Sequence, residues 1–114
     1  IELLRKKGQA IAAKRAGREA GEGFIGSYAH TTGKLAALVA LKCETDFVAR
    51  NPDFRELARN LAMQVVAGDP VDKEALLIQP YFRDESKTVR ALLDEAAAKI
   101  GEKIEIGEFM RIQI

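Results

Sequence analysis

Residues 35–43, LAALVALKC, limit the possible folds more than any other part of the chain. In an extended chain successive side chains point to opposite faces, so this run presents apolar side chains on both of its faces. A strand of that kind belongs in the centre of a sheet or under cover on both sides. The two faces consist of Leu35, Ala37, Val39 and Leu41 on one side and Ala36, Leu38 and Ala40 on the other.

A second run with strand character, GEGFIGSYAH at residues 21–30, precedes this strand. The polar residues TTG, at 31–33, separate the two runs, and two such runs around a Gly-containing turn predict an antiparallel hairpin. The end of the chain, KIEIGEFMRIQI, also alternates and predicts a strand that returns to the hairpin. The apolar residues expected to share one face of this last strand, interrupted by Glu108, are Ile104, Ile106, Met110, Ile112 and Ile114.

Two helices are predicted between the hairpin and the last strand. Asn51-Pro52 is a strong start signal, because Asn caps a helix through its side chain and Pro fits the first helical position. This helix is expected to end at GDP, residues 68–70, and residues 70–83 are expected to be irregular. The second helix is expected to begin near DESK, residues 84–87, and to end at Gly101.

The order of these elements predicts an α+β fold in two layers, in which the hairpin and the C-terminal strand form an antiparallel sheet packed with helices. A basic helix is expected ahead of this domain at residues 1–20, which are rich in Ala, Lys and Arg. Residues 1–18 contain six basic residues and one acid and so carry +5, which leaves −4 of the net +1 for the remainder. This uneven charge favours an oriented protein partner.

Signals for other functional classes are weak. The basic segment has no aromatic side chain for base stacking, so nucleic-acid binding is disfavoured and a solvated helix face is the commoner meaning. An enzyme is not predicted, because His30 has no obvious partner for acid–base chemistry and Cys43 is more typical of a strand-end thiol. No metal-ligand cluster or phosphate-binding glycine loop occurs, so neither a metal nor a cofactor is expected. No run of 18 apolar residues occurs either, and no membrane association is expected.

The stretch CETDFVAR, residues 43–50, places Phe47 between an acid and the start of a helix. Two interpretations follow from the residues alone. In the first, Phe47 packs just ahead of the helix that begins at Asn51, and Thr45 or Asp46 caps a short turn. In the second, Phe47 is exposed and contacts a partner. The local pattern does not decide between them.

CETDFVAR also resembles the TDFV signature of the elongation factor Ts family, the guanine nucleotide exchange factors of the translational GTPase elongation factor Tu. The likeness extends through IGSYAHTTGKLAALVALK and QPYFRDESKTVRALLDEAAAKIGEKIEI and so covers nearly the whole chain. It implies that the Asp-Phe pair inserts between helices of the GTPase and disturbs its Mg²⁺ site. By this resemblance Phe47 is the apolar wedge, Asp46 fixes its orientation, and the residues expected to bind elongation factor Tu are Thr45, Asp46, Phe47 and Val48.

The same resemblance implies secondary contacts with the GTPase. These are Lys14 in the linking segment, His30 at the hairpin tip, and Ile100 and Gly101 in the KIGE stretch. Solvated charge for Lys14, and core and cap roles for Ile100 and Gly101, remain open alternatives.

The resemblance also predicts the organisation of the chain and its surroundings. Residues 1–20 are expected to link an N-terminal domain that lies outside this sequence to a core, dimerisation-type domain at residues 21–114. The family's middle insertion is shortened here to about residues 71–78, and IGEF, at 106–109, lacks the paired arginines of relatives. A single hairpin, where long relatives have two, suggests a homodimer. We expect a cytoplasmic exchange factor; the alternatives are a core that docks on Tu without exchange activity, or a basic-helix RNA-binding module.

Overall fold

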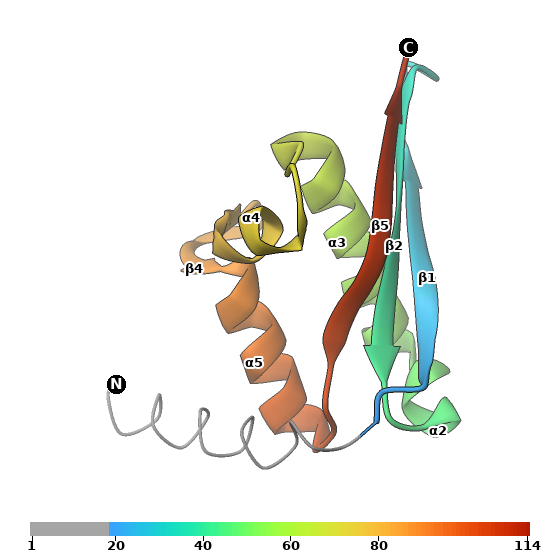
Figure 1. The fold of residues 1–114 in the computed structure, drawn as a ribbon, viewed down its shortest axis with the longest axis vertical. Helices are drawn as coiled ribbons and strands as arrows, with labels where there is room; N and C mark the ends of the chain where they lie inside the picture. Colours follow the sequence, from blue (N-terminus) through green and yellow to red (C-terminus); the bar gives the residue numbers. More distant parts are fainter. Residues whose placement is uncertain (1–18) are drawn as a thin grey trace.

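The computed structural model describes residues 19–114. The basic helix predicted for residues 1–20 lies almost wholly outside the described residues, and Lys14 lies outside them too. The described part is an α+β fold, as the sequence predicts, with antiparallel sheets packed against helices (Figure 1). None of its helices is long and apolar enough to cross a membrane.

The main sheet has three antiparallel strands, β1 (Glu22–Ala29), β2 (Leu35–Cys43) and β5 (Glu105–Gln113), in the order β1-β2-β5. β1 and β2 form the predicted hairpin, and the doubly apolar strand β2 is the central one. The hairpin turn uses Gly33, whose φ of 73° lies in the left-handed region that favours glycine. β5 returns from the C-terminal part of the chain to pair with β2, which confirms the predicted third strand.

One helix, α3 (Pro52–Gly68), packs against a single face of this sheet (Figure 1). It begins where predicted, because the Asn51 side chain accepts a hydrogen bond from the amide of Asp53 at 2.8 Å and a proline takes the first helical position. The helix backbone meets the β1 backbone at Gly26, where an added Cβ would lie 2.3 Å from the carbonyl carbon and oxygen of Ala58. Only glycine permits so close an approach.

The segment expected to be irregular, residues 70–83, contains regular structure. A short helix, α4 (Lys73–Ile78), leads into a second sheet made of β3 (Pro80–Tyr81) and β4 (Asp84–Thr88). The buried side chain of Gln64 ties this small hairpin to α3, because its Oε1 accepts a hydrogen bond from the hairpin backbone at 2.9 Å. Such a long-range contact leaves no periodic pattern in the local sequence.

The second long helix, α5 (Val89–Ile100), begins later than predicted. DESK, residues 84–87, has the composition of a first helical turn, but it pairs with β3 as most of strand β4. The cap of α5 is Thr88, whose Oγ1 accepts a hydrogen bond from the amide of Ala91 at 3.1 Å. The predicted end of the helix at Gly101 is confirmed, with a left-handed φ of 88°.

Strand β5 changes phase in its middle. Its register pairs Phe109 with Val39 but Ile106 with Leu41, so two residues of β5 lie opposite one residue of β2. This bulge inverts the alternation of side chains beyond it. Ile106 faces the core, whereas Met110 is exposed on the other face of the sheet. The prediction that the apolar residues of this strand share one face is therefore wrong.

The core lies between α3 and the sheet, where Leu41, Phe54 and Ile106 are almost completely buried. The helices α3, α4 and α5 all lie to one side of the sheet (Figure 1). The opposite face, here named the outer sheet face, is left exposed by residues 19–114 although it carries large apolar side chains. These side chains are Ile25, Leu38, Met110 and Ile112.

Candidate partner-binding site

A short helix, α2 (Asp46–Ala49), follows β2 and carries an apolar side chain into solvent. Cys43, the last residue of β2, is fully buried, whereas Phe47 is 85% exposed. The next residue, Val48, returns to the core and anchors the turn. Of the four residues predicted here, the exposed ones are Thr45, Asp46 and Phe47, and the buried one is Val48.

The exposure of Phe47 answers the question that the local sequence leaves open. Burial of a Phe side chain stabilises a protein by roughly 1.5–3 kcal/mol, and Phe47 obtains little of this within the chain. Val48 and Phe54 fill the buried positions around the start of α3, so the interpretation of Phe47 as a packing residue is wrong. The capping part of that interpretation holds, because Thr45 Oγ1 accepts a hydrogen bond from the amide of Val48 at 3.3 Å.

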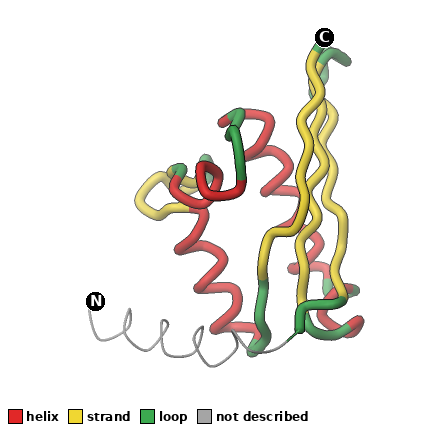
Figure 2. The backbone as a smooth tube through the Cα atoms, viewed as in Figure 1, coloured by secondary structure: helices red, strands yellow, loops and turns green. Residues whose placement is uncertain are grey.

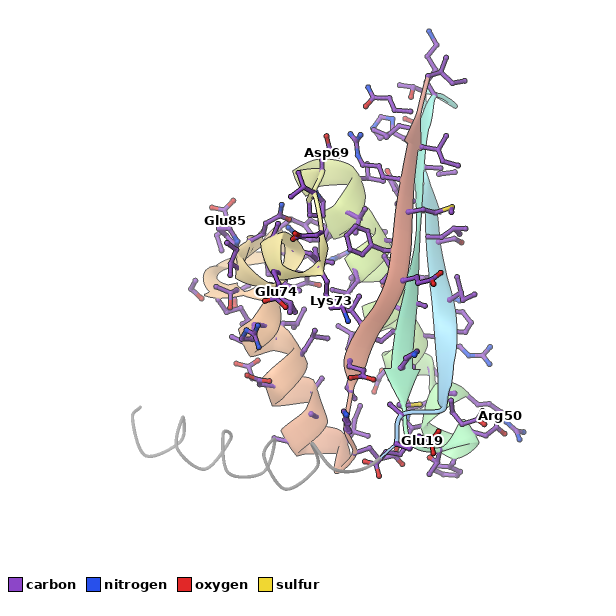
Figure 3. All side chains as sticks on the ribbon, viewed as in Figure 1. Glu19, Arg50, Asp69, Lys73, Glu74 and Glu85 are labelled. Carbon is purple, nitrogen blue, oxygen red and sulfur yellow. The ribbon has the colours of Figure 1, made fainter. Side chains whose placement is uncertain are left out.

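Asp46, beside Phe47, is paired within the chain. Arg50 Nε donates a hydrogen bond to Asp46 Oδ2 at 2.8 Å, and Arg50 Nη2 also contacts this oxygen. The hydrogen bond from Arg50 is the main cause that lowers the pKa of the Asp46 carboxyl below its usual value. Both side chains are largely exposed, so the pair stabilises the fold little. Figure 3 shows Arg50 beside α2 at the end of the sheet.

The turn that carries Phe47 is held from a distant segment, by Glu102. One carboxylate oxygen, Oε1, accepts hydrogen bonds from the amides of Glu44 and Thr45 at 3.0 and 3.1 Å. The other, Oε2, accepts one from the Thr45 hydroxyl at 2.7 Å. Glu102 was not among the predicted site residues, because 57 positions separate it from Thr45. The one available signal was its position directly after the helix cap in KIGE.

Ile100 and Gly101 therefore end α5 beside the Phe47 turn. Ile100 is half-buried and packs against the core, and the Gly101 amide donates a hydrogen bond to the carbonyl of Ala97 at 2.9 Å. Core and cap roles thus account for both residues within the chain.

His30 directly follows β1 and α2 follows β2, so they lie at opposite ends of the sheet. Figure 2 shows loops at both of these ends of the three strands. The nine residues of β2 rise by about 27 Å between these ends. His30 Nδ1 accepts a hydrogen bond from the amide of Thr32 at 3.3 Å, and its ring meets the edge of Tyr28 at 6.2 Å between centroids. One chain therefore does not bring His30 and Phe47 into a common site.

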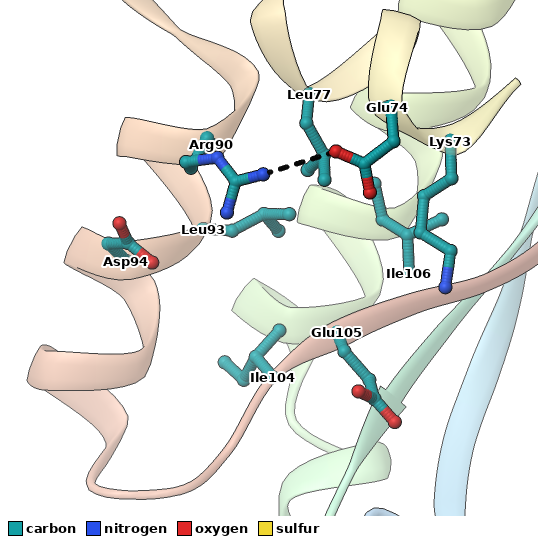
Figure 4. A pocket seen from close by; sticks show the side chains of 9 residues that line it. All are labelled: Lys73, Glu74, Leu77, Arg90, Leu93, Asp94, Ile104, Glu105 and Ile106. Carbon is teal, nitrogen blue, oxygen red and sulfur yellow. Dashed lines mark ion pairs between the residues drawn. The ribbon is translucent and has the colours of Figure 1, made fainter. Parts of the chain in front are cut away.

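A hollow of about 220 Å³ lies between α4, α5 and β5 (Figure 4). Glu74 and Arg90 form an ion pair across it at 3.6 Å, and Asp94 lies beside them. Burial raises the pKa of the Asp94 carboxyl. None of the predicted site residues within 19–114 lines this hollow, and the same residues contain no group of three or more His, Cys, Asp or Glu side chains that could hold a metal ion.

Comparison with known proteins decides the family of the chain. The sequence profile described as Elongation factor TS matches residues 44–114, which include the Phe47 turn and Glu102. The chain belongs to the elongation factor Ts family. Elongation factor Ts of Nitratidesulfovibrio vulgaris is 40% identical, and that of Oleidesulfovibrio alaskensis is 39% identical; each alignment covers the whole of this chain and 80% of the relative. The protein of the same name from Desulforamulus reducens is 37% identical, with 73% of it covered.

These alignments of elongation factor Ts confirm the resemblance that the CETDFVAR and KIGE stretches indicate. Each extends over 159 residues, against the 114 of this chain. The chain is therefore a short form within the region that it shares with these relatives.

Proposed function

We propose that this chain binds elongation factor Tu in the cytoplasm and promotes release of GDP from it, as a guanine nucleotide exchange factor of translation elongation. One observation carries the proposal: Phe47 is 85% exposed on a turn that the core holds in place. Family membership supplies the role in translation elongation. The chain acts by binding rather than by bond making, with no cofactor of its own, and residues 21–114 form the core domain.

The wedge acts on the nucleotide site of the GTPase. A GTPase holds its nucleotide through a phosphate-cradling loop and a Mg²⁺ ion that demands near-ideal octahedral geometry. In our proposal Phe47 inserts between elements that carry this site, and Asp46 exchanges its Arg50 partner for a polar group of the GTPase. Linkage then requires that nucleotide weakens binding of the chain by the same factor by which the chain weakens binding of nucleotide. Either GDP or GTP can therefore displace the chain, and no nucleotide site on the chain is needed.

Roles for the remaining predicted residues follow from their places. Thr45 and Val48 hold the turn, the first as its cap and the second as its core anchor. Ile100 and Gly101, which end α5 next to Glu102, would contact the GTPase beside the wedge. His30 would contact it elsewhere, about 27 Å away along the sheet.

We also propose that a second copy of the chain covers the outer sheet face. Met110 and Ile112 are 54% and 62% exposed there, and with Leu38 they line a groove of about 310 Å³. A soluble monomer seldom leaves so many large apolar side chains together on one face. A sheet-to-sheet dimer would bury them and would place His30 of one subunit and Phe47 of the other over one GTPase.

The oligomeric state tests this dimer directly. We expect a dimeric mass for the parent chain in analytical ultracentrifugation and a monomeric mass for Met110→Glu. Val71→Glu is the control, because Val71 is 90% exposed and lies outside this face. A monomeric mass for the parent chain at working concentration would exclude the dimer.

Release of a fluorescent GDP analogue from elongation factor Tu tests the exchange function. We expect the parent chain to accelerate release and Phe47→Ala to lose this acceleration. Val71→Ala, which trims an equally exposed apolar side chain elsewhere, should retain it. Acceleration that survives in Phe47→Ala would refute the wedge.

The same assay separates the alternatives. A parent chain that binds Tu but does not accelerate release is a docking core. Binding to RNA that falls steeply and linearly with the logarithm of salt concentration would instead indicate the basic-helix RNA-binding module.

A further inference from the structure

The α2 turn is too short to hold its own shape. Isolated helices of fewer than roughly 12–15 residues are marginal in water, and α2 has four residues. Its conformation, and hence the direction of the Phe47 side chain, must be fixed by contacts from outside the turn. The contacts to α2 itself come from β1, β2 and α3, including a hydrogen bond from Arg55 Nε to the carbonyl of Ala49 at 3.1 Å, and those to the residues just before it come from the segment after α5.

The Glu102 carboxylate supplies the polar contacts at the start of the turn, where its direction is set. It accepts three hydrogen bonds from the turn, two from successive amides and one from the Thr45 hydroxyl. The Thr45 hydroxyl in turn accepts from the amide of Val48, so one chain of hydrogen bonds runs from Glu102 into the first turn of α2. Hydrogen bonds to an ionised group are stronger than those between neutral groups.

The contact between the two segments is reciprocal. The Glu44 carboxylate accepts a hydrogen bond from the amide of Lys103, while Glu102 accepts from the amide of Glu44. The left-handed conformation of Gly101 ends α5 immediately before Glu102, where the chain turns toward β2. Within the turn itself, the Cys43 thiol donates a hydrogen bond to the carbonyl of Thr45 at 3.2 Å.

We propose that Glu102 is a positioning residue for nucleotide exchange, which presets the Phe47 turn in the conformation that enters the GTPase. This inference rests on the proposed function. Glu102 acts through Thr45 and not by touching nucleotide or Mg²⁺. A turn already in its binding conformation loses less conformational freedom on association. The hydrogen bonds from the turn to Glu102 therefore raise affinity for elongation factor Tu.

The expected effect follows from population arithmetic. If Glu102→Ala leaves the competent turn about one-tenth populated, the apparent affinity falls about tenfold. The concentration of chain that gives half-maximal GDP release rises by that factor, while the release rate at saturation is retained because Phe47 still inserts once bound. In a Phe47→Ala background the same substitution should have little further effect, since both act through one contact.

Two measurements on the full chain test the inference. The first is the concentration dependence of GDP release for Glu102→Ala, with Glu85→Ala as the control, because Glu85 is an exposed acid on β4 (Figure 3). The second is hydrogen exchange of the Glu44, Thr45 and Val48 amides in the free chain. We expect Glu102→Ala to speed exchange at these amides about tenfold or more and leave those of α3 unchanged. Glu102→Gln, which keeps a carbonyl oxygen as acceptor, should restore part of the protection and part of the affinity.

Each of the two measurements can contradict the inference on its own. Unchanged amide protection in Glu102→Ala would overturn the positioning role even if the parent chain exchanges GDP. A tenfold loss of affinity, measured by titration of nucleotide-free elongation factor Tu, that persists undiminished in the Phe47→Ala background would overturn it as well. A parent chain that does not accelerate release removes the proposed function and the positioning role with it, whatever the amides do. If Glu102→Ala does not fold, Glu102→Asp keeps the charge, shortens the reach by one methylene, and should give the same loss of affinity.

Discussion

Two phenylalanines seven positions apart should respond in opposite ways to the same substitution. Phe54 is 1% exposed at the start of α3, and Phe47 is 85% exposed on α2. Truncation of a buried Phe to Ala costs about 3–5 kcal/mol of unfolding free energy, because it removes buried area and leaves a cavity. Truncation of an exposed side chain usually changes that free energy by no more than about 0.5 kcal/mol.

The order reverses for binding to elongation factor Tu. Full burial of a Phe side chain is worth roughly 1.5–3 kcal/mol, and 85% of that of Phe47 remains to be gained in a complex. The gain available is therefore about 1.3–2.6 kcal/mol, which corresponds to a loss of affinity of about 10- to 80-fold for Phe47→Ala. A folded Phe54→Ala chain retains Phe47 and should lose much less affinity.

Urea unfolding followed by circular dichroism gives the stability of each variant, and titration of nucleotide-free elongation factor Tu gives its affinity. We expect Phe54→Ala to lower the unfolding free energy strongly and Phe47→Ala to leave it almost unchanged. A loss of stability in Phe47→Ala comparable to that of the core variant would show that Phe47 is packed in solution. The assignment of Phe47 as a wedge would then fail.

Three further substitutions test the fold around the site. Gly26→Ala should lower the unfolding free energy by about 1–3 kcal/mol or more, because its Cβ would overlap the Ala58 backbone, and an unchanged melting temperature would refute that contact. Gln64→Leu keeps the side-chain volume but leaves the amide of Phe82 without its acceptor, so we expect a loss of about 1–3 kcal/mol and faster hydrogen exchange at that amide, and unaltered exchange would contradict this. Burial, aided by the Glu102 charge, raises the pKa of Cys43 from 9.0 to about 11, so its stabilising effect is complete below pH 9 and is lost as the pH rises through 11. Between pH 9 and 11, Cys43→Ala should lose less unfolding free energy than the parent chain, as measured by urea titration at each pH. An identical dependence of the unfolding free energy on pH in the two chains would refute the effect.

Local chemistry made much of the scaffold predictable. Asn51-Pro52 marks the start of α3 because cap and first-turn preferences act within three residues. The hairpin was predictable for a similar reason, since two apolar runs flank a turn that needs glycine at position 33. DESK misled the prediction because its acids suit a helix start, while the partner that makes it a strand, β3, was itself hidden in a stretch without periodicity.

The candidate site was predictable only in part. The CETDFVAR pattern indicated which residues belong together through resemblance, but the local pattern could not show that Phe47 faces solvent and Val48 the core. Glu102 escaped prediction because its contact with Thr45 joins segments 57 positions apart. Lone acids after helix caps are common, so only the folded chain reveals which backbone amides such a carboxylate meets.

The bulge in β5 divides the apolar side chains of this strand between the two faces of the sheet. Before the bulge, Ile106 is buried in the core; beyond it, Met110 and Ile112 are exposed on the outer sheet face. If the present residues paired without the bulge, strict alternation from Ile106 would turn Phe109 outward and draw Met110 and Ile112 inward. Deletion of one residue at position 108 would remove the bulge but keep the present faces, because Phe109 would then lie two positions after Ile106. Whether β5 pairs with a bulge therefore decides which face of the sheet receives Met110 and Ile112.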